Sequence, residues 1–229
     1  MRGAKGSSPL QPGGAVTRIE RFTLDGPAGA LEALLESDPS ASPRASAVVC
    51  HPHPLYGGAM HNKVVFRIAK AALGLGIPTL RFNFRGVGTS AGQFDNGPGE
   101  RDDVRAALGF LRLRFAGLPI VVAGFSFGAW VGLAVGAQEP DVQALVGAGL
   151  PVASSPFAFL AGVTKPKLIV QATEDQYAPR EKVQALYNSL DEPKRLHWVE
   201  GVDHFFGTRV DEVRQAASDF LREVLEMMP

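Results

Sequence analysis

Short apolar segments alternate with longer amphipathic segments from residue 47 to the end of the chain. The short segments have the length and composition of buried strands and cover residues 47–50, 79–84, 119–123, 144–149, 167–172 and 195–199. In the longer segments apolar residues recur at helical spacing, over residues 62–75, 100–115, 127–138, 179–190 and 210–227. Strands that alternate with amphipathic helices predict an α/β fold, with a mostly parallel, doubly wound sheet covered by helices on both faces.

The N-terminal part of the chain follows another pattern. Residues 17–24 and 30–36 are strand-like and flank the turn Asp25-Gly26-Pro27-Ala28-Gly29, which predicts an antiparallel hairpin. Residues 1–16 are rich in Gly, Ser and Pro and contain no apolar stretch typical of a signal peptide, so we expect a flexible tail. The absence of a repeat or a second hydrophobic pattern predicts a single domain over residues 17–229.

Composition excludes several classes of function. Lys and Arg together number 23, as do Asp and Glu, so the formal net charge of zero argues against a nucleic-acid surface or an electrostatic membrane anchor. No apolar segment is long enough to span a bilayer. The single cysteine, Cys50, lies in an apolar run, where we expect a buried thiol, and it allows no intrachain disulfide. We therefore expect a cytoplasmic protein without nucleic-acid or membrane partners.

The motif Gly124-Phe125-Ser126-Phe127-Gly128 stands between a predicted strand and a predicted helix. In this setting the chain turns sharply at the serine, and flanking glycines supply the room because they carry no Cβ. The Ser126 hydroxyl would then project above the sheet at a helix N-terminus, where negative charge is stabilised. The alternative is a glycine-rich turn with a solvated serine, so the motif needs partners elsewhere in the chain.

A serine nucleophile requires a base and an acid that orients it. His204 lies in the loop between the last predicted strand and the final helix, whereas His197 lies inside a strand. Asp175 follows the strand over residues 167–172, and we favour it over the neighbouring Glu174. The order Ser126, Asp175, His204, each placed after a predicted strand, is the order found in α/β hydrolases.

Developing negative charge on a substrate oxygen needs N–H donors. The first candidate is the backbone N–H of Phe127, which follows the nucleophile. The second should come from the loop at residues 51–58, where prolines leave His53, Leu55 and Tyr56 as candidates. We select Leu55.

The same loop carries His51 and His53, with His61 nearby, which raises the alternative of a metal site. No carboxylate or cysteine ligand pattern accompanies these histidines, so we expect neither a metal nor another cofactor.

These segments together resemble the α/β-hydrolase superfamily over nearly the whole chain from about residue 47. The chain is most similar to small bacterial serine hydrolases akin to dienelactone hydrolases and carboxylesterases, with Cys50-His51-Pro52-His53-Pro54-Leu55-Tyr56-Gly57-Gly58, Phe82-Asn83-Phe84-Arg85-Gly86-Val87-Gly88-Thr89-Ser90 and the serine motif. The resemblance implies a Ser126–His204–Asp175 triad and an oxyanion loop at residues 53–56. Dienelactone hydrolases have a cysteine nucleophile where this chain has Ser126, so their substrate is not carried over.

Only residues 150–166 separate two predicted strands at the place where larger members insert a helical lid. We therefore expect no full lid and an open site, in which Tyr56, Phe157 and Phe159 contact the substrate. Such a site favours esters of small acyl groups as the small-molecule substrate. The alternatives are a thioesterase, amidase or acyltransferase on the same triad, and a non-catalytic binding protein on a hydrolase fold. The sequence leaves the oligomeric state open.

Overall fold

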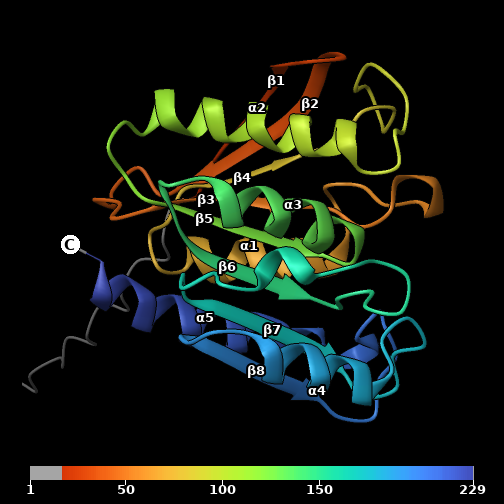
Figure 1. The fold of residues 1–229 in the computed structure, drawn as a ribbon. Coiled ribbons are helices and arrows are strands. Elements are labelled where there is room, and N and C mark those ends of the chain that lie inside the picture. The colour runs from red at the N-terminus through yellow and green to blue at the C-terminus, as the bar shows by residue number, and fades with distance from the viewer. Residues whose placement is uncertain (1–16, 229) are drawn as a thin grey trace, which may run out of the picture.

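The computed structural model describes residues 17–228, whose strands form one eight-stranded sheet with the order β1-β2-β4-β3-β5-β6-β7-β8 (Figure 1). The strands are β1 (Arg18–Gly26), β2 (Gly29–Ser37), β3 (Ser46–Cys50), β4 (Thr79–Phe82), β5 (Ile120–Phe125), β6 (Val142–Ala148), β7 (Lys167–Ala172) and β8 (Lys194–Val199). Strands β3 to β8 are all parallel to one another, whereas β2 is antiparallel to both β1 and β4. The predicted α/β fold with its N-terminal hairpin is confirmed.

Helices cover both faces of this sheet (Figure 1). One face packs against α2 (Pro98–Arg114), α3 (Phe127–Gln138) and α4 (Arg180–Ser189), and the other against α1 (Lys63–Leu73) and α5 (Val210–Met227). Each face has its own hydrophobic core, because side chains of the buried strands alternate between the two sides. The tail predicted for residues 1–16 lies outside the described residues.

The register of the parallel strands brings their carboxyl ends to one edge of the sheet. Cys50 at the end of β3 pairs with Gly124 of β5, and Phe125 at the end of β5 pairs with Ala148 at the end of β6. Loops that leave these ends therefore meet above the same edge, which is where open α/β sheets bind ligands.

Strand β4 ends at Phe82, two residues before the predicted boundary, because the following backbone donors bind elsewhere. The N–H of Asn83 donates to the carbonyl of Glu32 at 2.8 Å, and the N–H of Phe84 donates to Nε2 of His51 at 2.9 Å. The second of these bonds ties the end of β4 to the loop that follows β3.

The connection between β6 and β7 contains only the short 3₁₀ helix η2 (Ala158–Leu160), so the fold has no lid domain at this position. Within residues 17–228, none of the helices combines the length and the apolar character that crossing a membrane requires.

Candidate active site

Ser126 occupies a strained turn between β5 and α3. Its backbone angles are φ +57° and ψ −122°, a conformation that non-glycine residues adopt at a cost of about 1–3 kcal/mol. Glycine is required on both sides: a Cβ at Gly124 would lie 2.4 Å from the carbonyl oxygen of Gly128, and one at Gly128 would lie 2.3 Å from that of His51. Close packing of the strand against the helix thus accounts for the spacing of the motif.

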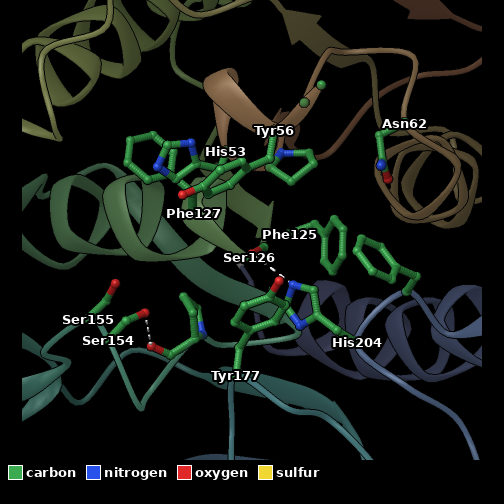
Figure 2. A pocket seen from close by; sticks show the side chains of 15 residues that line it. His53, Tyr56, Asn62, Phe125, Ser126, Phe127, Ser154, Ser155, Tyr177 and His204 are labelled. Carbon is green, nitrogen blue, oxygen red and sulfur yellow. Dashed lines mark hydrogen bonds between the residues drawn. The ribbon is translucent and has the colours of Figure 1, made fainter.

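A continuous chain of hydrogen bonds joins Ser126, His204 and Asp175. The Oγ of Ser126 lies 2.9 Å from Nε2 of His204, and Nδ1 of His204 lies 2.7 Å from Oδ2 of Asp175 (Figure 2 shows the first contact). His204 and Asp175 are almost fully buried, at 3% and 5% exposure. Because the carboxylate only accepts, Nδ1 carries a proton and Nε2 is free to accept the proton of the serine.

Asp175 is held in place by two further donors. Nε2 of Gln171 donates to Oδ2 of Asp175 at 2.6 Å, and the N–H of Tyr177 donates to Oδ1 at 2.8 Å. Oε1 of Gln171 in turn accepts from the N–H of Leu150 at 2.8 Å. The carboxylate is therefore fixed toward His204, whereas the competing Glu174 makes no recorded contact with the imidazole among the described residues.

Aromatic rings enclose the imidazole of His204. The ring centroids of Tyr177, Phe125 and Phe205 lie 4.8, 5.0 and 5.4 Å from its own. These ring contacts limit rotation of the imidazole.

In the loop after β3, the N–H of Leu55 is not free, although a free N–H would be expected of an oxyanion donor. The N–H of Leu55 donates to Nδ1 of His53 at 3.3 Å, that of Tyr56 donates to the carbonyl of His53 at 3.1 Å, and Leu55 itself is 68% exposed. The 3₁₀ turn η1 (Pro54–Tyr56) folds these donors back onto His53, so the N–H of Leu55 does not point freely into the cavity as an oxyanion donor should. The N–H of His53 has no recorded partner within residues 17–228.

His51 is fully buried, and both of its ring nitrogens are engaged. Nδ1 lies 2.7 Å from the carbonyl oxygen of Pro52, and Nε2 accepts from the N–H of Phe84. Burial lowers the pKa of His51 to about 4, so the ring is neutral near pH 7. His51 therefore has no lone pair left for a metal, and within residues 17–228 no group of three or more His, Cys, Asp or Glu side chains is placed to hold one.

An open cavity of about 170 Å³ lies above Ser126 (Figure 2). Its lining includes His53, Tyr56, Phe127, Tyr177 and His204. The expected contact residue Tyr56 stands at its mouth and is 86% exposed.

Phe157 and Phe159 do not line this cavity, contrary to expectation. Phe157 is buried, its ring packs on Phe159 at 5.5 Å, and both belong to the hydrophobic core around α3. The short connection folds inward, and its apolar side chains pack against the core that includes α3. Two serines of this connection, Ser154 and Ser155, line the cavity instead.

A family model described as an alpha/beta hydrolase domain matches residues 45–228. The chain belongs to the α/β-hydrolase superfamily. An uncharacterised protein of Rickettsia prowazekii is 36% identical over 213 residues, which cover 89% of each chain.

Solved α/β-hydrolase structures are similar along nearly their whole length. An α/β serine hydrolase homologue from Coxiella burnetii is 38% identical with a TM-score of 0.83, and the match covers 88% of this chain and 97% of that one. A lidless α/β serine hydrolase from Xanthomonas campestris is 35% identical with a TM-score of 0.82, and the match covers 94% and 97% of the two chains.

Two residues of this α/β hydrolase have roles that the sequence alone does not predict. Gln171 is fully buried and orients Asp175, and its signal in the sequence is an amide within an otherwise apolar strand segment, Leu168-Ile169-Val170-Gln171-Ala172. For His51, the local sequence suggests only a role as a metal ligand. Its bonds to Pro52 and Phe84 depend on how β4 ends, which the local sequence does not reveal.

Proposed function

We propose that this α/β hydrolase is a serine esterase that cleaves carboxylic esters of small acyl groups through an acyl-enzyme. The observation that carries the proposal is the hydrogen-bonded chain from Ser126 through His204 to Asp175. The similar proteins from Coxiella burnetii and Xanthomonas campestris, described as serine hydrolases, support the same class.

In the proposed reaction Oγ of Ser126 attacks the ester carbonyl while Nε2 of His204 takes the hydroxyl proton. Asp175 stabilises the resulting imidazolium through Nδ1. His204 then donates this proton to the leaving alcohol, which departs as the acyl-enzyme forms. A water molecule, deprotonated by the same nitrogen, hydrolyses the acyl-enzyme, so that the acid is released and Ser126 regains its proton.

The tetrahedral intermediate places negative charge on the former carbonyl oxygen. We assign its donors to the N–H of Phe127, at the first position of α3, and to the N–H of His53. The helix N-terminus adds a favourable field for this oxygen. His53 takes the part first given to Leu55, because its N–H has no hydrogen-bond partner within residues 17–228 and because His53 lines the cavity.

The size of the cavity supports small acyl groups. An apolar cavity of about 150 Å³ holds a molecule as large as benzene, and the volume here is about 170 Å³. Exposed apolar side chains stand on or beside the rim, namely Leu55, Tyr56, Tyr177 and Phe205. Such a rim supports uncharged, apolar esters over charged ones, with Tyr56 as a substrate contact.

A series of p-nitrophenyl esters with acyl chains of increasing length, measured beside matched thioesters and anilides, tests the proposal. We expect kcat/KM to be highest for short acyl esters and to fall for long chains. Ser126→Ala should lower kcat by at least about 10⁴-fold. Thioester or amide turnover that exceeds ester turnover would reassign the substrate class, and activity that survives in Ser126→Ala would refute the mechanism.

A further inference from the structure

We propose that His51 is a positioning residue that aims the backbone N–H of His53 at the substrate oxygen. The inference rests on the proposed function, since it concerns the second oxyanion donor. His51 does not line the cavity, and it acts through the peptide unit that joins Pro52 to His53.

The two ring nitrogens of His51 have partners that fix their chemistry. The carbonyl oxygen of Pro52 can only accept, so Nδ1, 2.7 Å away, carries the proton and donates. The N–H of Phe84 can only donate, so Nε2, 2.9 Å away, accepts. The buried ring packs edge-on against Phe84, with centroids 4.7 Å apart. His51 thus spans the gap between the end of β4 and the Pro52 carbonyl in one tautomer.

The carbonyl that His51 binds and the N–H of His53 belong to the same peptide unit. In a planar trans peptide these two groups point in opposite directions. A hydrogen bond that holds the Pro52 oxygen toward His51 therefore holds the His53 N–H away from His51. The N–H has no recorded partner within residues 17–228, which leaves it free to donate to a substrate.

Two glycines confine the same segment by close approach. A Cβ at Gly58 would lie 2.1 Å from the Pro52 oxygen, and a Cβ at Gly128 would lie 2.3 Å from the carbonyl oxygen of His51. Gly58 thus lies against the peptide between Pro52 and His53, and the His51 ring binds the oxygen of that peptide. The backbone of His51 itself packs closely against α3.

The far end of the loop is tied to the same strand end. The N–H of Met60 donates to Oδ1 of Asn83 at 2.8 Å, and the carbonyl of Met60 accepts from Nη1 of Arg81 at 2.9 Å. Residues 81–84 therefore bind both ends of the segment from His51 to Met60. Of these contacts, only that of His51 acts directly on the peptide between Pro52 and His53.

A pair of amide variants separates the two hydrogen bonds of the ring. The amide of asparagine reaches the position of Nδ1, so His51→Asn keeps a donor for the Pro52 oxygen. The longer glutamine reaches the position of Nε2, so His51→Gln keeps an acceptor for the Phe84 N–H but not the donor. Both variants lose the ring and its packing, which makes each the control for the other.

We expect His51→Gln to lower kcat for a short p-nitrophenyl ester by about 10- to 100-fold with little change in KM, because a misaimed donor forfeits much of what an oxyanion N–H contributes. His51→Asn should keep kcat within about threefold of the unmodified chain. Inhibition by an alkyl trifluoromethyl ketone, which gives a tetrahedral oxyanion on Ser126, should weaken in His51→Gln by a similar factor. Each kcat is calculated per active site, and the active sites are counted by their reaction with a fluorophosphonate, so that unfolded protein does not lower the value.

Equal kcat values in the two variants, or an unchanged trifluoromethyl ketone affinity in His51→Gln, would refute the positioning role while leaving the esterase proposal intact. An unmodified chain that turns over none of the esters would instead refute the proposed function, and this inference with it. If His51→Gln does not fold, Gly58→Ala displaces the same peptide from its other side. It should lower kcat and ketone affinity together, and a lowered stability with unchanged kcat per folded site would count against the inference.

Discussion

Acidification should destabilise this protein through His51, because the folded chain keeps that imidazole neutral. Burial lowers its pKa from 6.5 to about 4. The pKa difference of about 2.5, at about 1.4 kcal/mol per unit, amounts to about 3 kcal/mol of unfolding free energy. The sign follows from proton uptake: below about pH 6.5 the unfolded chain binds a proton that the folded chain does not.

The contribution of His51 is therefore fully present above about pH 6.5 and is lost progressively as the pH falls to about 4, with about 2 kcal/mol gone by about pH 5. Urea unfolding between about pH 7.5 and about pH 5, followed by tryptophan fluorescence, measures it by linear extrapolation. His51→Asn is the matched control, because it removes this one titrating group and leaves the others in place.

Across this range the unmodified chain should lose about 2 kcal/mol more unfolding free energy than His51→Asn does. Parallel pH dependences in the two proteins would show that His51 titrates normally in the folded state. That result would contradict both its burial and the tautomer on which its two hydrogen bonds depend.

Two further substitutions test how the site is held. Gln171→Leu removes a donor to Asp175 and leaves the buried Leu150 N–H without an acceptor. The free energy of unfolding should fall by about 1–3 kcal/mol, and kcat should fall as well. An unchanged kcat would show that Gln171 does not orient Asp175. Gly128→Ala should destabilise the chain by about 1–3 kcal/mol or more, since its Cβ would meet backbone oxygens. In contrast, Gly109→Ala in α2, where an added Cβ would point into open space, should stabilise it by about 0.5–1 kcal/mol. Equal thermal shifts in the two variants would contradict the close packing around Gly128.

The fold and the three central side chains were accessible from the sequence for one physical reason. Parallel strands end at a common edge, so polar residues that directly follow separate strands meet there. Ser126, Asp175 and His204 each follow a strand, and the structure joins them through hydrogen bonds. The observed helix boundaries differ by a few residues from the predicted ones where a capping interaction sets the first turn. Helix α2, for example, begins at Pro98 because Glu100 accepts from the Gly97 N–H.

The parts that could not be predicted depend on contacts between distant segments. Whether Leu55 or His53 offers a free N–H depends on a 3₁₀ turn whose donors fold back onto His53. Whether Phe157 and Phe159 face the cavity or the core depends on how residues 150–166 pack on α3. Composition describes such a segment as apolar but does not say which apolar surface it covers.

Labelling with phenylmethylsulfonyl fluoride, followed by peptide mass spectrometry, tests the central claim most directly. Three serines line the cavity, Ser126, Ser154 and Ser155, but only Ser126 lies within hydrogen-bond distance of His204. The sulfonyl group should attach to Ser126 alone, at one per chain, and the label should be lost in Ser126→Ala. Modification of Ser154 or Ser155 instead, or an unreactive Ser126 in the folded protein, would contradict the assignment of Ser126 as the nucleophile.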